Sequence, residues 1–481
     1  MDTQLTDPYN EQWQQLVFPP GYRNPRPRDR YNLLVIGAGP AGLVAAMGGA
    51  LLGAKVALIE RQAMGGDCLN VGCVPSKTLL ASAARALSFQ EALRRVRAVR
   101  AQIADHDSVE RYTQAGIDVF LGSASFVNPH ETRVGEAVLR ARKILIATGA
   151  RPLIPPITGL KDLQPLTNET VFDLVEQPRR LAVLGGGPIG CELAQAFTRL
   201  GTRVELIELQ PRVLPNEDPD AADLVSRALA RDGVCLHLGS RVSSAFRMDG
   251  SRVLELEGGK RIDCDEILVA IGRRRNLEDL NLDAAGVRFD PKSGIEVNAR
   301  LQTSQTHIYA AGDVCSRYQF THNADAQARL VLRNALFLGR VRADRLVIPW
   351  CTYTKPEVAH VGATRSELEQ AGQPFDRYRV DFGELDRGVT DDGADGYAEV
   401  LTRKGSDRII GATVVGKDAG EHLSPILLMM IRGVGLGRLG SLVLPYPTRS
   451  EYLRRLADYY MRTRLTPRTA RMLKWWLGRT R

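Results

Sequence analysis

A glycine-rich turn occurs twice in this chain, each time between a short apolar run and an alanine-containing stretch. The first copy is Gly-Ala-Gly-Pro-Ala-Gly at residues 37–42, and the second is Gly-Gly-Gly-Pro-Ile-Gly at residues 185–190. In both copies the next apolar run ends in an acidic residue, Glu60 or Glu208, at the same distance from the first glycine. A strand, a turn of this kind and a helix form the dinucleotide-binding fingerprint. The repeat therefore predicts two Rossmann-like dinucleotide-binding domains.

The three glycines of each turn have different physical roles. The first permits the tight turn, the second lets the backbone approach a pyrophosphate, and the third lets the helix pack on the strand. The pyrophosphate then lies at the helix N-terminus, where free N–H groups favour anions. The candidate dinucleotide-binding residues are Gly37, Gly39, Gly42 and Glu60 in the first copy, and Gly185, Gly187, Gly190 and Glu208 in the second.

Two cysteines, Cys68 and Cys73, follow the first copy in the run Gly-Gly-Asp-Cys-Leu-Asn-Val-Gly-Cys-Val-Pro-Ser-Lys at residues 65–77. On an undistorted helix, five residues rise about 7.5 Å and rotate by about 140°. A disulfide requires Cα atoms less than about 7 Å apart. An oxidised pair must therefore lie on a distorted first turn, which the glycines of the run permit. Because a helix start favours the thiolate, the pair is a candidate redox centre next to a bound cofactor.

This run resembles the active-site signature of the FAD-dependent pyridine nucleotide-disulfide oxidoreductases, which include dihydrolipoamide dehydrogenase, glutathione reductase and mercuric reductase. Residues 144–152, 268–276, 308–314 and 349–362 also resemble segments of that family. The resemblance implies an α/β fold with an FAD domain, an NAD(P) domain and a C-terminal α+β dimerisation domain. The expected ranges are 1–30 (irregular leader), 31–160 and 281–348 (FAD domain), 161–280 (NAD(P) domain), 349–465 (dimerisation domain) and 466–481 (basic tail).

The resemblance also implies a route for electrons, from NAD(P)H to FAD and then through a Cys68–Cys73 disulfide to an outside acceptor. Cys73 is expected beside the flavin, and Cys68 is expected to meet the substrate. Lys77 and Glu192 are expected to form a charge pair near the flavin, where positive charge favours reduction. Further cofactor contacts implied by the family motifs are Gly66, Lys77, Thr148, Gly149, Gly312 and Asp313 for FAD, and Gly272 for NAD(P).

The preferred nicotinamide cofactor depends on Glu208. A carboxylate at this place bonds the ribose hydroxyls of NADH and repels the 2′-phosphate of NADPH. Arg212 lies nearby in the sequence and could pair with that phosphate. The sequence favours NADH and leaves NADPH as the alternative.

The segment 444–451, Leu-Pro-Tyr-Pro-Thr-Arg-Ser-Glu, departs from the disulfide-reductase pattern. In those reductases the partner subunit supplies a His-Pro-Thr…Glu motif whose histidine transfers the thiol proton. Here Glu451 is retained, Tyr446 replaces the histidine, and no histidine follows His422. A tyrosine, with a pKa of about 10, is a poor base near neutral pH. Efficient turnover of dihydrolipoamide or of a small disulfide is therefore the less favoured alternative.

Mercuric reductases also carry tyrosine at this place, and two thiolates suit the soft ion Hg(II). The resemblance therefore implies a mercuric-reductase-like homodimer whose active site is shared between subunits. Cys68 and Cys73 would bind Hg(II) as a substrate, and no structural metal is expected. The sequence has no N-terminal Cys-x-x-Cys metal trap and no cysteine after Cys351, unlike a complete detoxifying enzyme, so the acceptor stays open.

Charge is concentrated at the C-terminal end of the chain. The net charge is +9, and residues 461–481 contain seven Arg or Lys residues and no acid. Together with Trp475 and Trp476, these bases suit contact with an anionic membrane surface. A slowly turning over redox sensor or membrane-docking flavoprotein is therefore a second alternative. No nucleic-acid recognition motif accompanies the charge.

The polar N-terminus and the scattered cysteines predict a cytoplasmic protein. Met1-Asp2-Thr3-Gln4 does not resemble a secretory signal, and no run approaches the roughly 18 apolar residues of a membrane span. Seven cysteines in a chain of 481 residues do not form a secreted disulfide framework.

Overall fold

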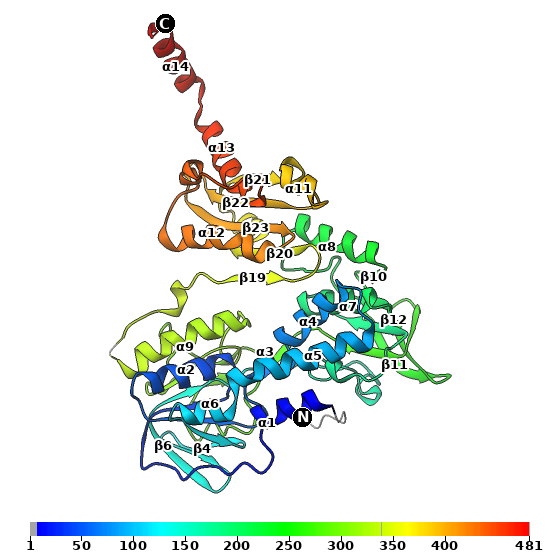
Figure 1. The fold of residues 1–481 in the computed structure, drawn as a ribbon, viewed down its shortest axis with the longest axis vertical. Helices are drawn as coiled ribbons and strands as arrows, with labels where there is room; N and C mark the ends of the chain where they lie inside the picture. The colour runs from blue at the N-terminus through cyan, green and yellow to red at the C-terminus, as the bar shows by residue number, and fades with distance from the viewer. Residues whose placement is uncertain (1–6, 338, 481) are drawn as a thin grey trace. The chain divides into compact units, whose positions relative to one another are not determined.

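The computed structural model describes residues 7–337 and 339–480, which form two units (Figure 1). Unit 1 contains the chain up to Leu209 together with Asp232–Leu346. Unit 2 contains Gln210–Arg231 and the chain from Val347 onward.

A parallel sheet forms the first half of unit 1. Its order is β3-β2-β1-β6, and β18 pairs with the opposite edge of β6. The strands are β1 (Tyr31–Ile36), β2 (Val56–Glu60), β3 (Asp118–Leu121), β6 (Ala137–Ile146) and β18 (Ile308–Ala310). Leu33 and Val35 enter one hydrophobic core, whereas Leu34 and Ile36 enter another. Both faces of the sheet are thus buried, which explains why its strands are continuously apolar.

Helices cover this sheet, and two of the helices in this region carry the cysteine pair. The helix α2 (Pro40–Leu51) packs beside α9 (Thr321–Leu336), and both supply side chains to one core (Figure 1). The remaining elements of this region are α3 (Gly66–Asn70), α4 (Cys73–Ala83), α5 (Phe89–Ala104), α6 (Val109–Gln114), β4 (Ala124–Asn128) and β5 (Glu131–Val134). The strands β4 and β5 pair antiparallel with each other, and β5 pairs with the first part of β6.

A second parallel sheet, of order β10-β9-β8-β14, forms the other half of unit 1. Its strands are β8 (Arg180–Leu184), β9 (Arg203–Ile207), β10 (Cys235–His237) and β14 (Glu266–Val269), and α7 (Pro188–Arg199) joins β8 to β9. An antiparallel meander follows, with β11 (Val242–Met248), β12 (Ser251–Leu256) and β13 (Arg261–Cys264). Two short antiparallel pairs complete the unit: β7 (Ala150–Pro152) with β15 (Arg273–Arg275), and β16 (Phe289–Asp290) with β17 (Gly294–Ile295). The predicted pair of Rossmann-like domains is confirmed.

The expectation of an irregular leader over residues 1–30 is wrong for residues 8–17. They form α1 (Pro8–Val17), whose first turn is capped by the side chain of Asp7. Trp13 is buried and donates from Nε1 to Asn70 Oδ1 at 2.7 Å, while the Arg100 guanidinium stacks on its ring. An aspartate cap followed by proline is a helix-start signal, and burial of Trp13 stabilises α1 itself. Residues 1–6 lie outside the described residues.

Unit 2 is built on an antiparallel sheet of order β19-β20-β23-β22-β21. Its strands are β19 (Pro349–Thr352), β20 (Glu357–Gly362), β21 (Phe375–Asp381), β22 (Tyr397–Arg403) and β23 (Ile409–Gly416). The helices are α8 (Pro219–Asp232), α10 (Arg365–Gln370), α11 (Asp386–Thr390), α12 (Ala419–Arg432), α13 (Tyr452–Arg464) and α14 (Pro467–Arg479). Apolar residues of α12 and α13 share one core with the sheet. This α+β architecture agrees with the expected dimerisation domain.

Residues 210–231 group with unit 2, although the sequence places them in the NAD(P) domain. The reason is electrostatic. Asp220 forms ion pairs with Arg365, Arg377 and Arg379 at 3.0–3.1 Å. Asp218 accepts hydrogen bonds from the backbone N–H groups of Arg365 and Ser366. Asp218 immediately precedes α8, and Asp220 lies in its first turn. Their contacts attach the start of this helix to unit 2.

Glu217 is a buried acid of unit 2, and its position predicts a pH-dependent stability. Trp350 Nε1 donates to Glu217 Oε1 at 2.6 Å, but Glu217 Oε2 has no hydrogen-bond partner among the described residues. Burial raises the pKa of Glu217 from 4.5 to about 7. A carboxyl group whose folded-state pKa is raised destabilises the fold progressively as pH rises from the unfolded pKa to the folded one.

Glu217→Gln is therefore expected to stabilise the protein at pH 8, by about 2–3 kcal/mol, and to have little effect at pH 4.5. The amide keeps an acceptor for Trp350 and removes the buried charge. The measurement is denaturant unfolding from pH 4.5 to 8.5, with the exposed Glu369→Gln as control. Equal pH profiles for the wild type and Glu217→Gln would contradict the argument.

Candidate active site

The glycine turns have the geometry that a dinucleotide fingerprint requires. Gly37 and Gly185 adopt φ of +102° and +107°, and a Cβ at either one would overlap the backbone just after the end of a neighbouring strand. A Cβ at Gly42 would overlap the carbonyl oxygen of Gly37, because α2 crosses directly over the turn. The second turn repeats this overlap between Gly190 and Gly185. The first and third glycines are therefore required by packing.

The second glycine of each turn faces open space instead. A Cβ at Gly187 would meet no protein atom within 4 Å, and one at Gly39 would meet only Gly66 Cα, at 3.7 Å. Gly39 and Gly187 are also the N-caps of α2 and α7, and neither helix has a side-chain cap. Each turn thus presents helix N–H groups beside a gap that the protein does not fill, which fits a pyrophosphate.

An acidic side chain closes each turn in the same way. Glu60 Oε2 accepts from the Ala38 backbone N–H at 2.7 Å, and Glu208 Oε2 accepts from that of Gly186 at 2.6 Å. Burial raises the pKa of Glu60. Both residues are placed where a fingerprint acid binds ribose hydroxyls.

The two cysteines of the run lie on different helices. Cys68 is in α3, Cys73 is the first residue of α4, and the chain turns between them at Val71 and Gly72. A Cβ at Gly72 would lie 2.7 Å from the carbonyl oxygen of Asp67, so this close turn requires glycine. Both cysteines are free thiols in this structure. The break in the helix allows the approach that one regular helix would prevent.

The thiols of this pair have opposite acidities. A hydrogen bond from Cys68 lowers the pKa of Cys73, and the Thr321 hydroxyl and the positive charge of Lys77 lower it further. The Cys73 Sγ lies 3.5 Å from Thr321 Oγ1. The same hydrogen bond, together with burial, raises the pKa of Cys68. In the reduced pair the thiolate therefore forms on Cys73 while Cys68 keeps its proton. Thr321, the first residue of α9, is absent from the predicted site residues.

Lys77 and Glu192 meet as the sequence predicts. Lys77 Nζ of α4 donates to Glu192 Oε2 of α7 at 2.7 Å. The Glu192 side chain is only 5% exposed, whereas that of Lys77 is 36% exposed. The pair places a cation one helical turn beyond Cys73 and links the cysteine helix to the helix of the second glycine turn.

Asp313 lies three residues after the end of β18, and its side chain is 19% exposed. Burial raises its pKa to about 6, although Arg273 Nε lies 3.7 Å from its carboxylate. Arg273 also bonds Asp67, the neighbour of Cys68, and its Nε has no hydrogen-bond partner among the described residues. A half-buried acid with this neighbour fits a ligand that supplies hydroxyl groups, as the ribityl chain of FAD does. Sequence reasoning missed Arg273 and Asp67, although each stands beside a motif residue.

The other predicted cofactor residues lie in nearby turns. Gly149, Gly272 and Gly312 have positive φ, and a Cβ at Gly149 or Gly272 would meet no protein atom within 4 Å. The Thr148 hydroxyl donates to Asn276 O at 2.8 Å. A Cβ at Gly66 would lie 2.5 Å from Gly39 Cα, so the cysteine run passes directly over the first turn.

Tyr446 and Glu451 lie in unit 2 and bond to different partners. The exposed Tyr446 hydroxyl donates to Asp386, whereas Glu451 pairs with Arg455 at 3.1 Å. The hydrogen bond to Asp386 raises the pKa of Tyr446. The phenol therefore stays protonated at neutral pH and does not serve as a base. Sequence reasoning missed Asp386, because nothing in its local sequence relates it to Tyr446.

Two family models cover most of the chain. The model described as pyridine nucleotide-disulphide oxidoreductase matches residues 31–328. The model for the dimerisation domain of the same family matches residues 348–457. The second match supports a homodimer.

Similar proteins fall into several activity groups. The chain is 35% identical to a dihydrolipoyl dehydrogenase of Thermus scotoductus over 89% of this chain and 97% of that protein. It is 32% identical to a mercuric reductase of Staphylococcus aureus over 88% of this chain and 81% of that protein. Among solved structures, the HOCl-induced flavoprotein disulfide reductase RclA of Escherichia coli matches with 28% identity and a TM-score of 0.83, over 89% of this chain and 99% of that one. The chain therefore belongs to the pyridine nucleotide-disulphide oxidoreductases, which are enzymes that use FAD and NAD(P)H.

Proposed function

We propose that this enzyme passes electrons from NADH through FAD and the Cys68–Cys73 pair to Hg(II). The observation that carries the proposal is Tyr446, a protonated phenol held by Asp386 where disulfide reductases need a base. Reduction of Hg(II) requires no proton to be returned to a leaving thiol. The similarity to mercuric reductases supports the same acceptor.

The cysteine pair supplies the chemistry of the acceptor site. Cys73 offers a thiolate that Thr321 and Lys77 stabilise, and Cys68 supplies the second sulfur once it loses its proton. Two thiolates bind soft ions strongly. The overall reaction is NADH + Hg(II) → NAD⁺ + H⁺ + Hg(0). When bound, FAD accepts a hydride from NADH and supplies two electrons to the thiol side.

The two glycine turns support the proposed cofactor assignments. We assign to FAD the residues Gly37, Gly39, Gly42, Glu60, Gly66, Lys77, Thr148, Gly149, Gly312 and Asp313, and to NADH the residues Gly185, Gly187, Gly190, Glu208 and Gly272. NADH is preferred because the Glu208 carboxylate stands at the second turn and repels a 2′-phosphate. In the homodimer, Tyr446 and Glu451 serve the cysteine pair of the partner subunit.

Steady-state oxidation of NADH and NADPH tests this proposal. Purified enzyme is offered Hg(II) with excess thiol, then lipoamide, glutathione disulfide and a quinone. Cu(II) is tested as a further acceptor, because RclA has been solved as a Cu(II) complex. We expect Hg(II)-dependent turnover with NADH, several-fold faster than with NADPH. Turnover only with lipoamide would replace the proposal by the dihydrolipoamide dehydrogenase alternative, which the Thermus relative favours.

Tyr446→His is expected to raise turnover of lipoamide or a small disulfide at least about tenfold, because imidazole supplies the missing general base. The same change should lower Hg(II) turnover. Tyr446→Phe is the matched control, since it removes the hydroxyl that bonds Asp386 without adding a base. If Tyr446→His and Tyr446→Phe had equal disulfide activity, the account of the missing histidine would be wrong.

The basic tail supports a second proposal, peripheral contact of this enzyme with an anionic membrane. No residue of α14 is buried. Met472 and Trp476 share one helix face with Leu473 and Leu477, while Arg471, Trp475 and Arg479 follow one another at four-residue spacing. None of the helices in the described ranges is long and apolar enough to cross a bilayer.

Co-sedimentation with vesicles of mixed phosphatidylserine and phosphatidylcholine tests the membrane proposal. We expect binding by the full chain at low salt and its loss when residues 466–481 are removed, because basic residues near an anionic surface each contribute about 1 kcal/mol. Equal sedimentation of both chains would remove the idea. A bound enzyme that reduces its flavin but turns over no acceptor would support a redox-sensing role.

A further inference from the structure

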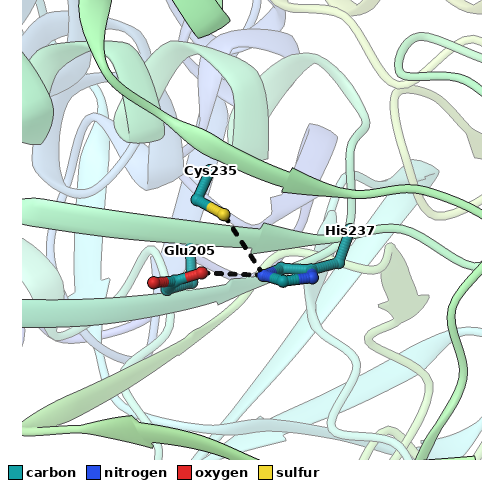
Figure 2. A group of neighbouring side chains, drawn as sticks. All are labelled: Glu205, Cys235 and His237. Atoms are coloured by element: carbon teal, nitrogen blue, oxygen red, sulfur yellow. Dashed lines mark hydrogen bonds and ion pairs between the residues drawn. The ribbon is translucent and has the colours of Figure 1, made fainter. Parts of the chain in front are cut away.

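A second group of side chains that can bind a metal lies on the second parallel sheet of unit 1. These side chains belong to different elements from Cys68 and Cys73, which are on α3 and α4. Glu205 is on β9, and Cys235 and His237 are on the neighbouring edge strand β10. In the register, Cys235 lies opposite Glu205, and His237 points to the same face two residues later. Their donor atoms all lie within 4.8 Å of one another (Figure 2). We propose that these three residues bind a zinc ion.

The arrangement around the His237 ring separates a metal site from a nucleophilic triad. Glu205 Oε2 lies 2.7 Å and Cys235 Sγ 3.6 Å from the same nitrogen, Nε2 (Figure 2). A triad needs the thiol and the carboxylate on opposite ring nitrogens, because one orients the ring while the other exchanges a proton. Here all three donors face one point, as the ligands of a shared ion do.

The distance between Cys235 Sγ and His237 Nε2 fits a tetrahedral ion, whereas the Glu205 oxygen must move. Zinc bonds sulfur at about 2.3 Å and nitrogen at about 2.0–2.1 Å, which places these two ligand atoms about 3.6 Å apart at tetrahedral angles. The observed separation of Cys235 Sγ and His237 Nε2 is 3.6 Å. The Glu205 oxygen must move from 2.7 Å to about 3.4 Å from Nε2.

The surroundings suit an ion that enters from solvent. Cys235 is exposed, whereas Glu205 and His237 are each 8% exposed, so the ion meets the sulfur first and solvent can fill the fourth position. Arg203 bonds the other oxygen of Glu205 at 3.1 Å, which leaves Oε2 for the ion. A thiolate and a carboxylate together neutralise the two charges of Zn²⁺.

Binding moves protons in a defined way. The Cys235 S–H bond breaks, a Zn–S bond forms, and one proton passes to solvent. The ring stays neutral, but its proton moves from Nε2 to Nδ1, so that Nε2 can bond the metal. Lys260 Nζ lies 3.2 Å from Nδ1 in the present structure, and this contact must open when Nδ1 carries a proton. Lys260 therefore competes with the ion.

The test uses the full-length, FAD-loaded Cys68→Ser/Cys73→Ser protein, which removes the redox pair as a competing zinc site. Zn²⁺ is titrated against a chromophoric chelator, and proton release is followed in weak buffer. We expect one equivalent of Zn²⁺ to bind, with release of one proton per ion. Adding Cys235→Ser should weaken binding at least about 100-fold, whereas adding Cys351→Ser should leave it unchanged.

Two further outcomes bear on the proposal. Adding Lys260→Met should tighten binding severalfold, because the competing contact to Nδ1 is removed. Zn²⁺ should raise the melting temperature of the Cys68→Ser/Cys73→Ser protein and not that of its Cys235→Ser derivative, since an ion that binds the folded state stabilises it. Binding that is absent, or that survives Cys235→Ser, would overturn the zinc site. Neither result depends on which acceptor the enzyme reduces.

Discussion

Cys68→Ser is expected to lower Hg(II)-dependent NADH oxidation at least about 100-fold, a barrier increase of about 2.7 kcal/mol or more. The serine hydroxyl is a poor ligand for a soft ion and cannot form a disulfide with Cys73. The measurement is steady-state NADH consumption with Hg(II) and excess thiol, together with capture of released mercury vapour. Reduction of a quinone is expected to stay within about twofold of the wild type, because a quinone can accept electrons directly from reduced flavin without using the thiols.

The matched control for this change is Cys351→Ser. Cys351 is a half-buried thiol of unit 2, on β19, and has no role in the proposed reaction. It should keep full Hg(II) turnover. Full residual Hg(II) activity in Cys68→Ser would contradict electron transfer through the cysteine pair, whatever the activity with lipoamide or glutathione disulfide. Equal losses of Hg(II) and quinone turnover would instead indicate damage to the flavin site.

Much of this fold could be predicted because its signals are local. Each glycine turn stands between the strand and helix that it joins, and the first and third glycines are required by the backbone next to them. The Lys77–Glu192 pair was also predictable, although only through the family resemblance, because its members lie far apart in the sequence. Local rules cannot join such distant positions without knowledge of the fold.

The features that sequence reasoning missed depend on tertiary contacts. Arg273 joins Asp67 and Asp313 across three separate segments, and no spacing rule relates them. The residues Asp7 and Pro8 are a helix-start signal for α1. The stability of this helix depends on burial of Trp13 against Asn70, which composition does not reveal. The zinc ligands share this character, because parallel pairing of β9 and β10 places Glu205 opposite Cys235.

Gly187→Ala and Gly190→Ala are expected to have different effects, although both change one glycine turn. Gly190→Ala should lose stability, whereas Gly187→Ala should stay folded and lose affinity for the nucleotide. A Cβ at Gly190 overlaps the carbonyl oxygen of Gly185, so this variant should lose about 3 kcal/mol or more of stability. A Cβ at Gly187 meets no protein atom, and its extended backbone suits alanine. Gly187→Ala should therefore keep or slightly raise the melting temperature, because alanine restricts the unfolded chain.

The stable variant is the informative one for function. If the pyrophosphate of NADH approaches the backbone at Gly187, the added methyl group occupies its space, and the Kd for NAD⁺ should rise about tenfold, or about 1.4 kcal/mol. Calorimetric titration of NAD⁺ and the KM for NADH measure this, and FAD content serves as the internal control because the first turn is unchanged. An unaltered Kd in a fully folded Gly187→Ala protein would show that the open side of the second turn does not bind the nucleotide. A raised Kd with full FAD content would assign the two turns to different cofactors.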